Sequence, residues 1–163
     1  SRNAPGPFAA GRLFLFLALC LSPRLLYAQT AAEIDTLLAA PQVSYAQSAR
    51  FVLEAAEKLP ITPLAGTKAE QTAFSLAREK GWLPPSAAQD DPAILGDLSL
   101  LIMKAFQLKG GIMYSLFPLP RYACRELAAK KIIQGRDDPN LTVSGTQLLH
   151  LVSRVLSREP GHE

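Results

Sequence analysis

The sequence predicts an all-α fold built on three pseudo-repeated helices. Three observations predict it: a fourteen-residue unit occurs three times at a fixed spacing of fifty residues, each copy carries an apolar stripe at helical periodicity, and glycine and proline interrupt the segments between the copies. A fixed internal period indicates a repeat architecture, in which related units bury their apolar faces against one another. The three copies therefore define the expected core of the molecule.

The three copies cover residues 43–56, 93–106 and 143–156. Their sixth, ninth, tenth and thirteenth positions are mostly apolar, and the i, i+3, i+4, i+7 spacing of these positions places them on one face of an α-helix. The ninth and tenth positions of the copies are expected to lie in the core: Phe51, Val52, Leu101, Ile102, Leu151 and Val152.

Two of the three helices have a recognisable start. Ser44 and Ser144 can each accept a hydrogen bond from the first helical turn. Gln47 and Gln147, three residues further on, can bond back to the backbone of the serine. The first and third copies are therefore predicted to begin with a capping box.

The middle copy has different residues in these places. Ile94 stands where the other copies have serine, and Asp97 stands where they have glutamine. An acid suits the N-terminus of a helix, but the capping hydroxyl is absent. We expect the first turn of this helix to be the least well fixed of the three.

Shorter helices are expected between the copies. Thr67 and Glu70 match a further capping box, so residues 68–80 are predicted to form a helix that ends at a glycine. Residues 121–133 are the predicted second outer helix. Residues 31–40 form a short predicted helix in front of the first copy.

Two further segments keep the same spacing. Residues 128–135 read AAKKIIQG and residues 78–83 read REKGWL, so Trp82 corresponds to Ile132 fifty residues later. Both side chains are interpreted as core residues, and Trp82 is expected to anchor its outer helix on the central helices.

These segments and the three helix starts resemble the S-layer homology repeat, whose usual helix start is Thr-Arg-Ala-Glu and whose preceding short helix ends Gly-Ile-Ile-x-Gly. The resemblance covers roughly residues 30–157 and is one of pattern, not of identity. It implies a three-pronged spindle with a central three-helix bundle and short prong helices. Its implied role is to hold proteins to cell-wall polymers in bacterial envelopes.

The chain departs from the family at one important position. The resemblance assigns the arginine of the helix start to binding the acidic wall polymer, and the three copies have Tyr45, Leu95 and Gly145 there. None of these residues can form a bidentate contact with a carboxylate. The resemblance therefore implies the fold more strongly than the ligand.

Residues 1–28 are interpreted as a secretory signal peptide, with arginines before a short apolar run and a cleavage site before Gln29. The run, residues 13–21, is too short to span a bilayer. The alternative is a lipoprotein acylated at Cys20. Residues 29–163 are then a single domain that does not cross a membrane, placed in the periplasm or cell envelope.

Charge and cysteine content narrow the function classes. The three arginines of residues 1–28 account for the whole net charge of +3, so the remaining domain is neutral and has no basic run. This neutral charge argues against nucleic acid as a partner.

Cys124 is the only cysteine of residues 29–163, so no disulfide is expected within the domain.

Residues 110–120 are unusually apolar for a connection. Two adjacent glycines and two prolines argue against a helix, and large apolar side chains lie between them. Such a loop either packs against the central helices or presents a surface to a partner. The candidate partner-binding residues are Gly110, Gly111, Met113, Tyr114, Phe117 and Arg121.

No residue pattern indicates catalysis, a metal or a cofactor. His150 is interpreted as a structural residue beside the apolar face, and Cys124 as a buried thiol without a neighbouring base. The acidic pairs at 90–91 and 137–138 both precede a proline and are interpreted as turn residues. We therefore expect a protein that is not an enzyme and needs no cofactor.

Two functions are compatible with these observations. The first is an exported cell-envelope protein whose S-layer-homology-like module binds cell-wall polymer or anchors an envelope assembly. The alternative is a periplasmic scaffold that docks on a protein partner through residues 110–120.

Overall fold

The computed structural model of the 163-residue chain describes residues 32–59 and 66–158. The predicted signal peptide, Cys20 within it, and His162 lie outside these residues. The chain divides into two units, with the boundary between Leu37 and Leu38. A short helix covers residues 32–39, and every other helix described below belongs to the second unit.

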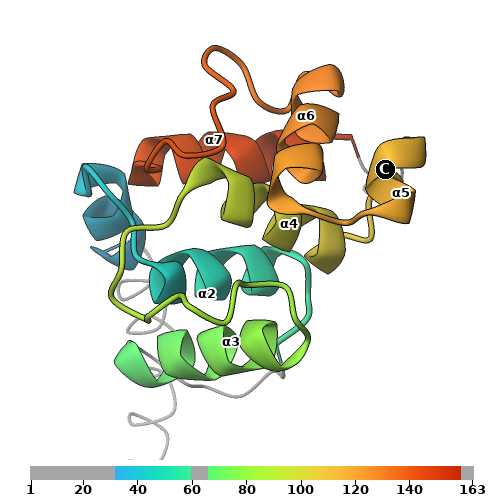
Figure 1. Ribbon diagram of the computed structural model, residues 1–163. Coiled ribbons are helices and arrows are strands. Elements are labelled where there is room, and N and C mark those ends of the chain that lie inside the picture. The colour runs from blue at the N-terminus through green and yellow to red at the C-terminus, as the bar shows by residue number, and fades with distance from the viewer. Residues whose placement is uncertain (1–31, 60–65, 159–163) are drawn as a thin grey trace, which may run out of the picture. The chain divides into compact units, whose positions relative to one another are not determined.

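The described residues confirm the all-α prediction, since they form helices and no strand longer than an isolated bridge. The helices of the second unit are α2 (Tyr45–Ala55), α3 (Thr67–Glu79), α4 (Leu95–Ala105), α5 (Ile112–Leu116), α6 (Pro120–Ala129) and α7 (Gly145–Leu156). Helix α2 packs against α3, α4 and α7, while α6 packs against α4 and α5 (Figure 1). The repeated units of the sequence are α2, α4 and α7.

A ring of three backbone hydrogen bonds joins the residues that precede these three helices. The N–H of Val43 donates to the carbonyl of Val143 (2.9 Å), that of Val143 to Ala93 (3.0 Å), and that of Ala93 to Val43 (2.8 Å). All three residues are buried. Because buried backbone groups must be paired, the ring fixes the starts of α2, α4 and α7 against one another. Its members are fifty residues apart, so the sequence repeat is also a structural repeat.

Backbone details beyond the ring follow the same period. Tyr45 N–H donates to the carbonyl of Asp91 at 3.0 Å, and Leu95 N–H donates to that of Leu141 at 2.8 Å. In the third repeat the corresponding N–H, that of Gly145, donates to the carbonyl of Ala40 at 3.1 Å. Strict repetition would place this acceptor one residue later, at Pro41. The segment before the first repeat is therefore related to the others only approximately.

Both predicted capping boxes of the central helices are present. Gln47 N–H donates to Ser44 Oγ (3.2 Å), and Ser44 N–H donates to Gln47 Oε1 (3.1 Å). The corresponding distances at Ser144 and Gln147 are 3.3 and 3.0 Å. As expected, no side chain caps α4.

The predicted box of Thr67 and Glu70 is not formed. Gly66 is the N-cap of α3, and Thr67 is already the first helical residue, so its hydroxyl cannot take the capping position. Helix α3 otherwise ends one residue before the predicted boundary. Helix α6 ends well before its predicted end, because Lys131 adopts a left-handed backbone conformation (φ 54°) that stops the helix.

Six of the eight residues that were predicted to lie in the core are buried. They are Val52, Leu101, Ile102, Ile132, Leu151 and Val152. Phe51 is only half-buried, because the buried stripe of α2 runs through Ala49, Val52 and Leu53 and Phe51 falls outside it. Helix α4, in contrast, is buried almost all round, so the corresponding Leu101 is enclosed.

Trp82 is the second exception, since it is also half-buried. The neighbouring Leu83 occupies the interior position instead. The indole lies under the Lys80 ammonium, with Nζ 5.5 Å from the ring centroid, and this arrangement keeps one side of the ring at the surface.

Candidate functional site

A cavity of about 380 Å³ lies between the second and third repeats. Its walls come from the N-terminus of α4, the turn after α6, the segment before α7, and α7 itself. The lining residues are Leu95, Ile133, Gln134, Arg136, Leu141, Thr142, Val143, Gln147, His150, Leu151 and Arg154. The α7 contribution follows helical spacing i, i+3, i+4, i+7, so one face of this helix is turned toward the cavity.

Arg154 is held in place at the edge of the cavity. Its guanidinium donates to the carbonyl of Ile132 (2.8 Å) and to Oε1 of Gln134 (3.0 Å). These two residues belong to the turn that ends the second outer helix, the same turn that resembles the Gly-Ile-Ile-x-Gly segment. Because two of its nitrogens are fixed, the remaining N–H groups of Arg154 have a defined direction.

Arg136 supplies a second guanidinium in the same lining. It follows Gly135, whose left-handed backbone (φ 99°) turns the chain after Ile133. The Arg136 side chain is exposed and makes no hydrogen bond or ion pair with any other described residue. None of the lining residues is acidic, so the cavity presents two positive charges beside an apolar floor.

The two acidic pairs have the predicted turn roles. Asp91 Oδ2 accepts from the N–H of Ala88 (3.1 Å), and Asp138 Oδ1 accepts from the N–H of Asn140 (3.0 Å). Such bonds shape the turns that lead into α4 and α7. Within the described ranges no group of three or more His, Cys, Asp or Glu side chains is placed to hold a metal ion.

His150 and Cys124 have different environments. His150 is exposed at the cavity, on the border of the buried face of α7. Cys124 is buried in α6, and its thiol donates to the carbonyl of Asp137 at 3.2 Å. Burial raises the pKa of the Cys124 thiol, which keeps it protonated and disfavours a nucleophilic role.

A buried polar pair joins the first and second repeats and was not predicted from the sequence. The hydroxyl of Tyr45 donates to Oδ2 of Asp97 at 2.6 Å, and both side chains are buried. Tyr45 is the third residue of the first fourteen-residue copy, and Asp97 is the fifth residue of the second copy, so the bond joins two repeats.

Burial shifts the ionisation of this pair. Desolvation raises the pKa of Asp97, and the hydrogen bond from Tyr45 offsets part of that rise. Burial and the neighbouring Asp97 raise the pKa of Tyr45 above its ordinary value, so the phenol remains the donor. Folded protein thus binds the Asp97 proton more tightly than unfolded protein does.

A pH dependence of stability follows from Asp97. Stability contributed by the protonated carboxyl is present below the pKa of unfolded aspartate and is lost as pH rises through the folded pKa. The wild type should lose stability over this window relative to Asp97→Asn, in which the amide oxygen still accepts from Tyr45. Urea unfolding at a series of pH values measures the difference. If the difference in free energy of unfolding between the two proteins does not change with pH, or shifts in favour of the wild type as pH rises, the raised pKa of Asp97 is wrong.

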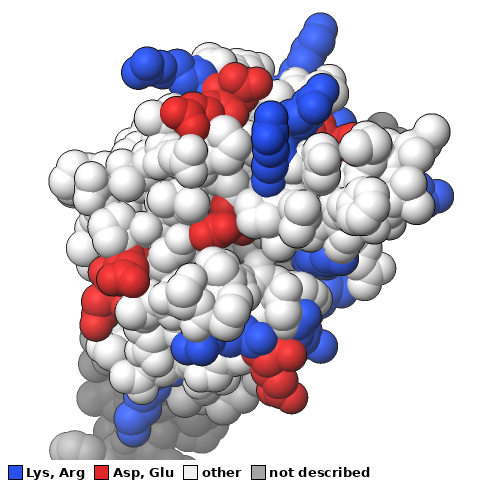
Figure 2. All heavy atoms as spheres, viewed as in Figure 1, with Lys and Arg blue, Asp and Glu red and all other residues white. Residues whose placement is uncertain are grey.

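Residues 110–121 form a surface feature of the second repeat. Contrary to the prediction of a loop, Ile112–Leu116 form the short helix α5. Of the predicted binding residues, Met113, Phe117 and Arg121 are exposed, whereas Tyr114 is buried. Figure 2 shows the surface over α5 as largely uncharged, with basic side chains at its edge.

The two glycines before α5 stand where a side chain would collide with neighbouring atoms. A Cβ on Gly110 would lie 2.4 Å from Cδ1 of Tyr114, and one on Gly111 would lie 2.9 Å from Oε1 of Glu126. The missing side chains allow Tyr114 to pack closely against Gly110, and Glu126 to approach Gly111.

No protein-family model, no curated protein and no solved structure matches this chain. Among the described residues no helix is both long enough and apolar enough to span a membrane.

Proposed function

We propose that the chain is a non-catalytic, exported cell-envelope protein whose S-layer-homology-like module binds an anionic cell-wall polymer. The observation that carries this proposal is the cavity between the second and third repeats, which combines Arg136, Arg154 and His150 with an apolar floor and no acidic residue. A carboxylate- or phosphate-bearing sugar has the complementary chemistry.

The ring of Val43, Ala93 and Val143 supports the spindle part of the proposal. It brings together the starts of α2, α4 and α7 through repeat-related backbone bonds. Three helices arranged in this way around a pseudo-threefold axis would form the central bundle of the spindle, with α3 and α6 as prongs. The cavity then lies in the groove between two successive repeats.

The cavity also offers a substitute for the missing box arginine. Tyr45, Leu95 and Gly145 provide no cation at the helix starts. Arg154 comes instead from the C-terminal half of α7, and Arg136 comes from the turn after α6. A guanidinium pairs with a carboxylate or phosphate through two parallel hydrogen bonds, whichever element carries it.

Binding to isolated cell walls and to acidic polysaccharide tests this function. Replacing Arg136 with alanine is expected to weaken binding about tenfold to a hundredfold, because a hydrogen bond to a charged group contributes about 1.5–3 kcal/mol. Thermal unfolding should be nearly unchanged, since the Arg136 side chain contacts no described residue through a polar bond.

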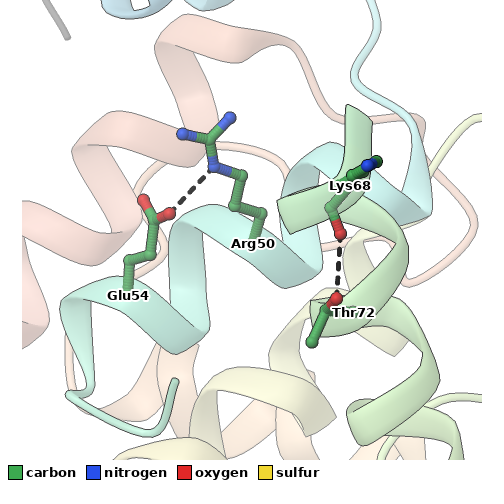
Figure 3. A network of polar contacts seen from close by, with 4 residues as sticks. All are labelled: Arg50, Glu54, Lys68 and Thr72. Atoms are coloured by element: carbon green, nitrogen blue, oxygen red, sulfur yellow. Dashed lines mark hydrogen bonds and ion pairs between the residues drawn. The ribbon is translucent and has the colours of Figure 1, made fainter. Parts of the chain in front are cut away.

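Lys68→Ala is the matched control. Lys68 is exposed in the first turn of α3, and only its backbone carbonyl takes part in a hydrogen bond, accepting from Thr72 Oγ1 at 2.9 Å (Figure 3). The substitution removes the same charge at a distance from the cavity, so binding should persist. The specific site at Arg136 would be refuted if folded wild-type protein bound no wall material. An equal loss of binding in Arg136→Ala and Lys68→Ala would refute it as well.

A further inference from the structure

The second repeat exposes a cluster of large apolar side chains that the fold does not use. Ile112, Met113, Leu116, Phe117 and Leu119 are all at least half exposed, with Ile112 reaching 79 %. We call these five residues the apolar patch. Elsewhere in the described part of the chain, only Ile34 is an exposed large hydrophobic residue. Such concentration marks an interaction surface, whereas single exposed residues do not.

The patch is held in a fixed orientation. Tyr114, on the other side of α5, is buried, and the Lys104 ammonium lies 5.9 Å from its ring centroid. Backbone bonds continue the turn: Phe117 N–H donates to Met113 (2.9 Å), and Leu119 N–H donates to Phe117 (2.8 Å). Helical spacing places residues 112, 113 and 116 away from the buried Tyr114. Phe117 follows the helix in a non-helical backbone conformation and is exposed as well.

The repeat architecture does not require these apolar residues. Fifty residues earlier, the positions equivalent to Ile112, Met113, Leu116 and Phe117 are Thr62, Pro63, Gly66 and Thr67. The first repeat therefore has small, polar or turn-forming residues where the second repeat has large hydrophobic ones. A feature present in one repeat and dispensable for the common fold is best explained by what it contacts outside the chain.

Four basic residues lie in the part of the chain that carries the patch. Residues 98–125 contain Lys104, Lys109, Arg121 and Arg125 and no acidic residue. Lys109 and Arg121 directly bracket the segment, and both are exposed. The nearest acid in this region is Glu126, which lies beneath Gly111 on the α6 side. The patch is thus bordered by the exposed Lys109 and Arg121, with Glu126 on the α6 side.

We propose that the apolar patch inserts into the surface of a lipid bilayer that contains anionic lipids. Its five side chains would enter the boundary between headgroups and acyl chains, while Lys109 and Arg121 would contact lipid phosphates. Apolar side chains flanked by lysine and arginine are the composition that favours this interfacial mode of binding. Helix α5 has only five residues, so the contact is peripheral.

Flotation of the full chain with vesicles tests the inference. Wild-type protein should bind vesicles of phosphatidylcholine mixed with phosphatidylglycerol, and binding should fall when phosphatidylglycerol is omitted. Leu116→Glu is expected to reduce binding to the mixed vesicles at least tenfold, because it places a charge in the apolar centre of the patch. Lys109→Gln combined with Arg121→Gln should remove the preference for phosphatidylglycerol.

Ile34→Glu is the matched control, since it makes the same kind of change at an exposed apolar residue outside the patch. This variant should bind the vesicles like the wild type. Equal vesicle binding by wild type and Leu116→Glu would overturn the inference. So would a wild type that ignores vesicles but forms a dimer, or a complex with an envelope protein, that Leu116→Glu abolishes, because the patch would then be a protein-docking surface.

The inference goes beyond polymer binding and can fail independently of it. Leu116→Glu leaves the cavity residues unchanged and should bind wall material like the wild type, whereas Arg136→Ala should bind vesicles like the wild type. The two variants therefore separate the two surfaces.

Discussion

Replacing Ala93 with proline is expected to lower the free energy of unfolding by about 3 kcal/mol or more. The N–H of Ala93 donates to the carbonyl of Val43 within the buried ring, and proline has no N–H to donate. The substitution would leave the Val43 carbonyl unpaired in the interior and separate the starts of α2 and α4. Urea unfolding followed by helical circular dichroism measures the change.

Gln42→Pro is the matched control for that substitution. Gln42 precedes Val43, and the second repeat already has a proline, Pro92, at the equivalent position before Ala93. The backbone of one repeat thus accommodates proline next to the ring. Gln42→Pro should therefore change stability by less than about 1 kcal/mol. If the two prolines destabilise the protein equally, the ring is not a principal source of stability.

The repeated helices could be predicted from the sequence because their signals are local. Ser44 with Gln47 and Ser144 with Gln147 each mark a helix start within four residues, and the apolar spacing marks the helix that follows. The ring of backbone bonds is not visible in any side chain. Only the constant period of fifty residues indicates that Val43, Ala93 and Val143 are equivalent.

Helix α5 was not predicted, because the glycines and the proline on either side of it indicate a loop. Gly110, Gly111 and Pro118 indicate a loop, yet the residues between them contain no helix breaker. A single helical turn is unstable alone, and here burial of Tyr114 supplies the missing stabilisation. The exposure of the patch was likewise undetermined, because the sequence allowed both a packed and an exposed segment.

The cavity could be predicted only in part. Gln147, His150 and Arg154 share one face of α7 by spacing alone, and this pattern could have indicated a polar surface beside the core. Arg136 lies in a turn, whose position depends on how α6 packs against α4. The Tyr45–Asp97 bond joins positions 52 residues apart in different repeats, so no local pattern reveals it.

Truncating Leu101 to alanine is expected to destabilise the protein by about 2–5 kcal/mol, the range for a fully buried leucine. Leu101 is completely enclosed in α4, and the methyl groups removed would leave a cavity that the surrounding helices fill only in part. Leu151→Ala should have a similar effect, since the equivalent leucine of α7 is also buried. Thermal and urea unfolding of the purified variants measure both values.

Two comparisons decide whether this destabilisation reports the shared core. Leu116→Ala removes the same atoms from a side chain that is 65 % exposed, so it should cost less than about 1 kcal/mol. The destabilisation caused by Phe51→Ala should lie between that of Leu101→Ala and that of Leu116→Ala. Phe51 is only half-buried, although it occupies the position equivalent to Leu101. If Phe51→Ala instead equals Leu101→Ala, the three repeats contribute equally to the interior. A graded series would show that the interior is centred on α4, with the first repeat rotated away from strict threefold equivalence.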